Sequence, residues 1–280
     1  MRPLLAAALL VAAAAPAPDE LAARLATPRV AAHRGGYGAP DSNTVARFEI
    51  SREQGADIVE TDLRLSKDGV VYLFHNELMD KVTSCAGPFA SHTSAEIDAC
   101  HLTGLDRGPD RFEDALRWSR GRVVIDAELK TPEVSEAAID LVRHHSAYDW
   151  VYFQVGNGLS TYERVRRYDR RVALEASPRG AKGERFLAAL LAKKDPRLLI
   201  IQLHPDFYSR RILQAVRDGG KRTSMNTWML VPETEGASCD AAYARGIDIA
   251  VTNAPQSCVT QRDRMFAAPS APAPSPAPTR

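Results

Sequence analysis

Short runs of β-forming residues alternate with longer helical patterns along almost the whole of this 280-residue chain. The predicted strands are Arg29–His33, Asp57–Leu65, Val70–His75, Arg122–Lys130, Trp150–Val155, Arg171–Ala176, Leu198–His204, Thr223–Trp228 and Ile247–Thr252. The predicted helices are Thr44–Gln54, Arg111–Arg120, Glu133–His145, Thr161–Tyr168, Glu184–Lys193, Ser209–Asp218 and Ala237–Ala244. Because helices separate most of the strands, the strands are expected to run parallel in βα units. Eight or so such units in about 245 residues favour a single-domain α/β fold, a closed TIM (β/α)8 barrel, over a doubly wound sheet.

The two ends of the chain differ in composition from the rest. A positively charged start precedes an apolar run from Leu4 to Ala15, which is shorter than the roughly 20 residues that a membrane-spanning helix needs. We interpret residues 1–17 as a secretory signal peptide, with an uncleaved anchor or a disordered leader as the alternatives. Residues 265–280 are rich in Pro, Ala and Ser and are expected to be disordered. The folded domain is therefore predicted over residues 21–264 of a secreted or periplasmic protein.

The four cysteines fall into two near pairs, Cys85 with Cys100 and Cys239 with Cys258. Export to an oxidising compartment favours disulfides. Four cysteines allow three connectivities, and the sequence alone does not choose among them. Pairing of nearest neighbours would close one loop after Cys85 and another near the C-terminus. Metal binding is an alternative that the missing CxxC spacing disfavours, and free buried cysteines are a third reading.

The charge pattern favours no macromolecular partner. The formal net charge is +1, and no basic run or interleaving of basic and aromatic residues occurs. Neither nucleic acid nor an acidic membrane is therefore expected as a partner. No run after the leader is long and apolar enough for a transmembrane helix, so no integral membrane segment is expected after signal cleavage.

Reactive side chains gather at the ends of the predicted strands, where the active sites of TIM barrels lie. The first strand ends in His33 and is followed by Arg34. In the second strand Glu60 and Asp62 share one face, because side chains alternate along a strand. Two carboxylates so placed suit a hard divalent cation. A solvated polar face is a weak alternative, because barrel strands are covered and buried carboxylates need a metal or a cationic partner.

Two further strands carry complementary groups. The third predicted strand ends in a second histidine, His75, which Asn76 follows. In the fourth strand Asp126, Glu128 and Lys130 share one face. We expect Glu128 to complete a three-carboxylate metal site and Lys130 to neutralise an anionic substrate.

This set of groups suits phosphate-ester chemistry. A metal and Arg34 would hold the phosphoryl oxygens and stabilise the charge of the transition state. His33 and His75 can divide the proton transfers, one accepting a proton from the nucleophile and the other protonating the leaving alkoxide. Imidazole suits both tasks because its unperturbed pKa is about 6.5.

Five sequence blocks resemble, in order, the signature blocks of glycerophosphodiester phosphodiesterases. They are His33–Gly36, Asn43–Thr44, Val59–Gly69, Phe74–Asn76 and Glu128–Lys130, with weaker similarity over Asn226–Trp228 and Gly246–Asn253. The resemblance implies a TIM barrel with a bound Ca²⁺ or Mg²⁺. It also implies hydrolysis of a glycerophosphodiester or a lysophospholipid-like substrate, with glycerol 3-phosphate and an alcohol as the products from a glycerophosphodiester. By position it assigns catalysis to His33 and His75, metal binding to Glu60, Asp62 and Glu128, and phosphate binding to Arg34 and Lys130.

The chain departs from the family pattern at a few positions. The family usually has Pro-Glu-Asn-Thr, whereas this chain places Ser42 at the position of the glutamate and Asp41 beside it. Asn76 replaces the aspartate that is common after the second histidine, and Asn253 replaces a late aspartate. These departures keep the catalytic groups and bear on the choice of substrate.

The remaining candidates are secondary. Trp228 ends a strand, which suits packing on a glycerol or lipid-derived group, although a core position is the alternative. His204 and Glu175 lie near strand ends and are further candidates for the pocket. The other histidines are expected at the surface, namely His92, His101, His144 and His145.

Two other functions stay open. One is a phospholipase D or phosphodiester lyase of the related sphingomyelinase-D-like group, in which a substrate hydroxyl attacks and a cyclic phosphate forms. The other is a catalytically idle barrel that serves as a periplasmic binding protein. The idle barrel predicts a missing histidine or metal carboxylate, and none is missing.

Overall fold

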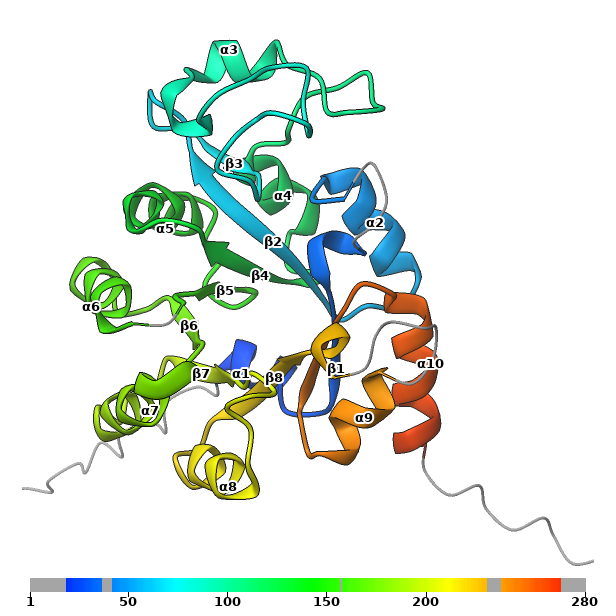
Figure 1. Ribbon diagram of the computed structural model, residues 1–280, viewed down its shortest axis with the longest axis vertical. Helices are drawn as coiled ribbons and strands as arrows, with labels where there is room; N and C mark the ends of the chain where they lie inside the picture. The colour runs from blue at the N-terminus through cyan, green and yellow to red at the C-terminus, as the bar shows by residue number, and fades with distance from the viewer. Residues whose placement is uncertain (1–18, 37–41, 157, 231–237, 268–280) are drawn as a thin grey trace, which may run out of the picture.

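Eight parallel strands close into a barrel in the computed structural model, which describes residues 19–36, 42–156, 158–230 and 238–267 (Figure 1). They are β1 (Arg29–Ala32), β2 (Ile58–Leu65), β4 (Val124–Leu129), β5 (Val151–Gln154), β6 (Ala173–Ala176), β7 (Leu198–Gln202), β8 (Arg222–Asn226) and β9 (Ile249–Thr252). The ring closes because β1 pairs with β2 on one side, with Ala31 opposite Ile58, and with β9 on the other. The predicted TIM barrel is confirmed.

Helices surround the barrel, as Figure 1 shows. They are α2 (Val45–Glu53), α4 (Phe112–Ser119), α5 (Ser135–His144), α6 (Leu159–Tyr168), α7 (Gly183–Ala192), α8 (Arg210–Asp218), α9 (Ser238–Ala244) and α10 (Pro255–Phe266). The first residues of two predicted helices, Thr44 and Ser209, are N-caps, whose side chains accept hydrogen bonds from backbone N–H groups. Short 3-10 helices occur at His33–Gly35, Phe89–Ser91, Pro132–Val134, Gly180–Lys182 and Thr227–Met229.

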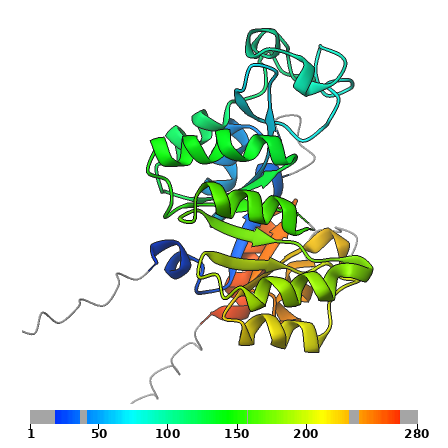
Figure 2. The same cartoon turned by 90° about the vertical axis from the view of Figure 1, so that its left-hand side faces the viewer.

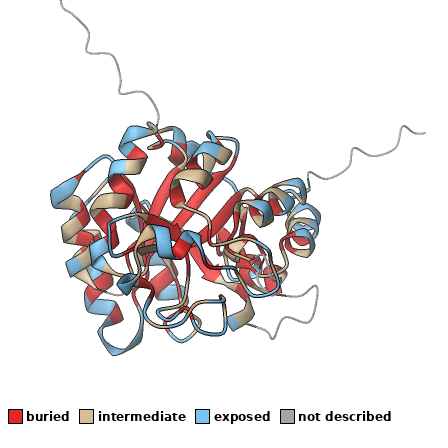
Figure 3. Ribbon diagram, turned by 90° about the horizontal axis from the view of Figure 1, so that it is seen from above, coloured by how far each residue is buried: buried red, intermediate tan, exposed pale blue. Residues whose placement is uncertain are grey.

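Strand residues alternate between two apolar clusters. Val59 and Leu63 of β2 face outward and pack with Phe48 and Phe112 from the helices. Ile58 faces the barrel interior, in a cluster that includes Leu21 of α1 (Glu20–Arg24). The helix α1 thus packs against apolar residues of the barrel interior, and it appears at the left of the barrel in Figure 2. Figure 3 shows the consequence, a buried barrel within helices whose outer faces are exposed.

One predicted barrel strand was wrong. The segment Val70–His75 contributes only β3 (Val71–Leu73), which runs antiparallel to the far end of β2 and pairs Leu63 with Leu73. The physical reason is the connection between the two strands, residues 66–69, which is far too short for a parallel crossover of a dozen or more residues. A turn forms instead, with the Ser66 N–H donating to the Val70 carbonyl over 2.9 Å.

The chain from residue 74 to residue 110 forms an excursion before it returns to the barrel at α4. The excursion contains α3 (Ser94–Asp98) and projects beyond the ring of helices, at the top of Figures 1 and 2. The Cys85–Cys100 disulfide lies within it, and Cys239–Cys258 joins α9 to α10. Both disulfides join nearest neighbours, which is one of the three connectivities that the sequence left open.

The termini bear on two sequence predictions. The predicted signal peptide, residues 1–17, and residues 268–280 of the predicted tail lie outside the described residues. Helix α10 was not predicted, and it continues to Phe266, so the first two residues of the predicted tail are helical. Within the described ranges, no helix has the length and apolar character needed to cross a membrane.

Candidate active site

Three carboxylates converge at one end of the barrel. Glu60 and Asp62 come from β2 and Glu128 from β4, and the pairing of these strands places Asp62 opposite Glu128. One carboxylate oxygen of each residue lies within 4.8 Å of the others. Burial raises the pKa of Glu60 well above its usual range, and the charges of Asp62 and Glu128 raise it further. Such a cluster is stable only when positive charge or protons offset the repulsion between its members.

Two cations lie against these carboxylates. Arg34 Nε is 3.0 Å from Asp62 Oδ2, and Lys130 Nζ is 3.3 Å from Asp62 Oδ1. Lys130 Nζ also donates to Glu128 Oε1 over 3.1 Å, and the backbone N–H of Arg34 donates to Glu60 Oε2 over 2.9 Å. The structure therefore brings the predicted phosphate-binding residues to the predicted metal-binding residues.

Backbone conformation sets the position of Arg34. This residue has a φ of 53°, in the left-handed region, within the 3-10 turn that follows β1. Gly35 has a φ of 71°, and a Cβ at this position would lie 2.8 Å from a ring carbon of Phe48. Only glycine satisfies both conditions without displacing α2, so Gly35 fixes the turn that carries His33 and Arg34.

His33 is a half-buried histidine of the site. Its Nδ1 lies 2.7 Å from Asn253 Oδ1, its Nε2 lies 3.9 Å from Glu60 Oε2, and its ring stacks on Trp228 with centroids 4.4 Å apart. Burial lowers the pKa of His33 to about 4; the bond to Asn253 opposes this shift, whereas Arg34 adds to it. At neutral pH the imidazole is therefore uncharged and able to accept a proton.

His75 reaches the site from a different direction than predicted. It follows the antiparallel β3, so His33 and His75 do not end neighbouring strands, because β1 and β3 both pair with β2. Its Nδ1 lies 2.8 Å from Asn76 Oδ1, and its carbonyl accepts a bond from Arg64 Nε over 2.9 Å. The charge of His75 also lowers the pKa of His33. Arg34, which follows His33 in the chain, lines the same cavity as His75.

Asn43 is a site residue whose role was not predicted. It is buried, with a φ of 64°, and its Oδ1 accepts a bond from Thr61 Oγ1 over 2.6 Å. Its Nδ2 donates to Asp62 Oδ2 over 3.4 Å, so it contacts a carboxylate of the predicted metal site. Asp41 lies outside the described residues, whereas Ser42 lines the cavity beside Asn43.

A second buried acidic layer lies deeper in the barrel. Glu175 and Asp126 are both fully buried, and Glu175 Oε1 accepts bonds from Gln154 Nε2 over 2.9 Å and from Ser224 Oγ over 3.0 Å. Burial raises the pKa of Glu175 to about 7. Burial also raises the pKa of Asp126 well above its usual range, with Glu175 and Glu60 adding to the shift.

The other secondary candidates lie outside this arrangement. His204 Nδ1 pairs with the exposed Asp206 over 3.4 Å. His145 Nε2 lies 3.1 Å from Glu113 Oε1, and these two residues form a second group of potential metal ligands with His144. That group was not predicted, and its carboxylate is already paired with Arg117 at 2.7 Å.

A cavity of about 290 Å³ opens beside His75. Arg34, Ser42, Asn43 and Asn76 line it on the side of the barrel, together with Leu73 and Phe74. The opposite wall comes from the excursion, through Lys81, Val82, Leu102 and Thr103. The site therefore combines a barrel end that carries the charged groups with a wall that belongs to the excursion.

A model of the glycerophosphoryl diester phosphodiesterase family matches residues 33–205, which is more than half of the 280-residue chain. The chain belongs to this family. The match confirms the resemblance read from the sequence blocks, and it includes every predicted site residue except Trp228.

Named members of the family are similar to this chain over part of their length. A glycerophosphodiester phosphodiesterase of Bacillus subtilis (strain 168) is 31% identical over 117 residues, which cover 42% of this chain and 37% of the relative. One from Bacillus altitudinis is 29% identical over 136 residues, covering 44% of this chain and 56% of the relative. The chain thus spans between about a third and three fifths of these relatives.

Solved structures of the family share the fold over most of their length. A glycerophosphodiester phosphodiesterase from Agrobacterium tumefaciens aligns with a TM-score of 0.69 at 23% identity, over 83% of this chain and 99% of that one. A phosphodiesterase from Oleispira antarctica, solved in complex with the product sn-glycerol-3-phosphate, aligns with a TM-score of 0.70 at 19% identity, over 85% of this chain and 97% of that one. These similarities support the family barrel for this chain.

Proposed function

We propose that this protein is a divalent-cation-dependent hydrolase that cleaves glycerophosphodiesters to glycerol 3-phosphate and an alcohol. One observation carries the proposal. Two histidines, each with Nδ1 beside an asparagine Oδ1, are grouped with a three-carboxylate cluster and two cations at one end of the barrel. Family membership and the product bound by the Oleispira antarctica relative support the same substrate class.

The carboxylates fit a hard divalent cation. Glu60, Asp62 and Glu128 offer only oxygen ligands, which suit Ca²⁺ or Mg²⁺, and Arg34 and Lys130 offset only part of the charge that is gathered there. These three residues would hold the cation, which when bound supplies Lewis-acid stabilisation of the phosphoryl oxygens. Arg34 and Lys130 bind the phosphate as charge-assisted hydrogen-bond donors.

The two histidines divide the proton transfers. As a water oxygen bonds to phosphorus, one imidazole accepts the proton that this water loses. The bond from phosphorus to the alcohol oxygen breaks, and the other imidazole, in its protonated form, donates a proton to that oxygen. The Oδ1 atoms of Asn253 and Asn76 accept hydrogen bonds from the Nδ1–H groups of His33 and His75, so each ring presents Nε2 to the reacting groups.

The proposal includes the kind of substrate and the location of the protein. The charged residues at the strand ends suit a small-molecule substrate, a glycerophosphodiester or a lysophospholipid-like molecule. The signal-peptide-like leader and the two disulfides support a secreted or periplasmic protein.

Product analysis tests the proposal. Purified protein is incubated with glycerophosphoglycerol, glycerophosphocholine and a lysophospholipid, with and without EDTA, and the products are followed by ³¹P NMR. We expect glycerol 3-phosphate from the glycerophosphodiesters, loss of turnover with EDTA, and recovery with Ca²⁺ or Mg²⁺. A cyclic phosphate would instead support the sphingomyelinase-D-like reaction, in which a substrate hydroxyl attacks the phosphorus. No turnover of any substrate would contradict the proposal and favour the idle barrel.

A further inference from the structure

The cavity beside His75 has room for more than a phosphate. Its volume is about 290 Å³, and its lining runs from Arg34 and His75 to residues of the excursion. A phosphodiester carries two ester arms, so a phosphorus held at Arg34 directs one arm into this cavity. On the other side of the site, Trp228 stacks on His33 and presents an aromatic face, which suits the glycerol arm. The cavity then receives the alcohol that leaves.

The charged side chains that line the cavity are positive. Arg34 and Lys81 are its cations, and none of its described lining residues is acidic. Its one aromatic side chain, Phe74, is only 4% exposed. A quaternary ammonium group binds in an aromatic cage or beside a carboxylate, and this wall provides neither. An alcohol with a negative charge finds a complementary cation, because Lys81 is in no ion pair among the described residues.

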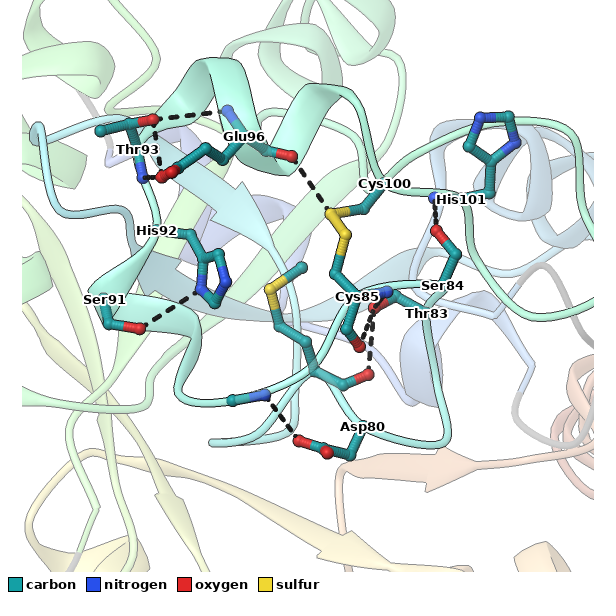
Figure 4. The surroundings of a disulfide bond; sticks show 12 residues. Asp80, Thr83, Ser84, Cys85, Ser91, His92, Thr93, Glu96, Cys100 and His101 are labelled. Atoms are coloured by element: carbon teal, nitrogen blue, oxygen red, sulfur yellow. Dashed lines mark hydrogen bonds between the residues drawn. A yellow bond between two sulfur atoms is a disulfide. The ribbon is translucent and has the colours of Figure 1, made fainter.

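The chain holds Lys81 at this position. Lys81 has a φ of 67°, and its carbonyl accepts a bond from Thr103 Oγ1 over 3.2 Å. The neighbouring Val82 carbonyl accepts a bond from the Thr103 N–H over 3.1 Å. The Cys85–Cys100 disulfide, which Figure 4 shows, joins the segment that follows Lys81 and Val82 to the segment that precedes Thr103. Asp80, next in the chain, is engaged elsewhere, because its carboxylate accepts from the Gly87 N–H over 2.8 Å.

We propose, on the basis of the proposed function, that this cavity is the leaving-alcohol subsite and that Lys81 selects glycerophosphodiesters whose alcohol carries a second anionic group. Arg34 binds the phosphate that is cut, and Lys81 binds the second charge. The preferred substrate class is therefore an anionic one, with a phosphate or a carboxylate on the alcohol.

The test compares two substrates that differ by one phosphate group, glycerophosphoglycerol and the same molecule with a phosphate on its terminal glycerol. We expect a higher kcat/KM for the phosphorylated substrate, mainly through a lower KM. The Lys81→Gln variant removes the charge but keeps a polar side chain, and it should lower kcat/KM for the phosphorylated substrate about 3- to 10-fold, the range for one charge-assisted contact. The matched control is Lys67→Gln, an exposed lysine that does not line the cavity and should leave the ratio between the substrates unchanged.

Each outcome distinguishes this inference from the function on which it rests. If the wild-type protein turns over neither substrate, the proposed function fails. If it turns over both at the same kcat/KM, or if K81Q lowers both by the same factor, the anionic subsite is wrong and the hydrolase remains. The subsite is supported if the ratio of kcat/KM for the phosphorylated substrate to kcat/KM for glycerophosphoglycerol is smaller in K81Q than in the wild type and unchanged in K67Q.

Discussion

Asn253 Oδ1 lies 2.7 Å from Nδ1 of His33, at the point where the last barrel strand ends beside the first. The asparagine oxygen accepts a hydrogen bond from the Nδ1–H group and so fixes the tautomer that presents Nε2 to the site. Burial lowers the pKa of His33 to about 4, and the bond to Asn253 raises it. The geometry assigns to Asn253 the task of orienting the ring and moderating its pKa.

Two variants of Asn253 separate these tasks. Asn253→Ala should lower kcat about 3- to 10-fold, because the ring loses the hydrogen bond that orients it. Asn253→Asp keeps an acceptor and adds a negative charge, which favours the imidazolium and raises the pKa of His33. The limb of the kcat–pH profile that depends on His33 should therefore move to higher pH in N253D. An unshifted profile in N253D would contradict the orienting contact.

The two histidines should behave as one unit. His33→Ala and His75→Ala should each lower kcat about 10²- to 10⁴-fold, because each removes a proton transfer, and the double variant should be only slightly worse. Substrate binding should change less, because Arg34 and Lys130 remain. His101→Ala, an exposed histidine of the excursion, is the control. Near-normal turnover by folded H75A would refute the two-histidine mechanism, and His204 would be tested next.

The barrel part of the site could be read from the sequence because strand geometry is local. Side chains alternate along a strand, so Glu60 and Asp62 had to share a face, and β4 placed Glu128 opposite Asp62. The order of the strands around the ring follows from the short βα connections. The fold and the shared face of Glu60 and Asp62 therefore follow from local patterns, whereas the position of Glu128 opposite Asp62 follows from the pairing of β2 with β4.

The rest depends on contacts between distant segments. His75 follows the antiparallel strand β3, and its position relative to His33 depends on how residues 74–110 fold back onto the barrel. Asn253 appeared only as a departure from the family pattern and Asn43 only as part of a resembling block, because their partners lie 220 and 19 residues away. Helix α10 was missed because its buried face contains Gln261 beside Pro255 and Cys258, so it lacks an apolar stripe.

Removal of the cation should abolish turnover and lower stability. The carboxylates of Glu60, Asp62 and Glu128 repel one another, so Ca²⁺ or Mg²⁺ that binds only the folded state should raise the Tm. Glu128→Gln should weaken the rise in Tm on Ca²⁺ addition as well as lower turnover. His144→Ala removes a ligand of the other possible cluster and should leave the Ca²⁺ response intact. Full activity after exhaustive chelation would exclude a cation requirement.

Glu175 should make stability depend on pH. Burial raises its pKa to about 7 from an ordinary value of 4.5. The Glu175 carboxyl therefore holds its proton more tightly in the folded state than in the unfolded state. Its contribution to the free energy of unfolding is largest below pH about 4.5. Its contribution falls as the pH rises towards about 7. Glu175→Gln removes this dependence while an amide oxygen can still accept from Gln154 and Ser224. The free energy of unfolding of E175Q minus that of the wild type should rise between pH 4.5 and 7, as measured by urea unfolding; a constant difference would contradict the shifted pKa.

The two disulfides should differ in what their loss does to activity. Cys85–Cys100 closes a loop with a sequence separation of 15 in the excursion that carries Lys81, and Cys239–Cys258 joins two helices with a separation of 19. The chain-entropy contributions are similar, about 3 kcal/mol each, so both double Cys→Ser variants should be destabilised by comparable amounts. Only C85S/C100S loosens a wall of the cavity beside His75, so it should raise KM for glycerophosphodiesters at a temperature where both variants remain folded. Steady-state kinetics and thermal unfolding of the two variants make the comparison. An equal rise in KM in both would show that the excursion does not shape the substrate site.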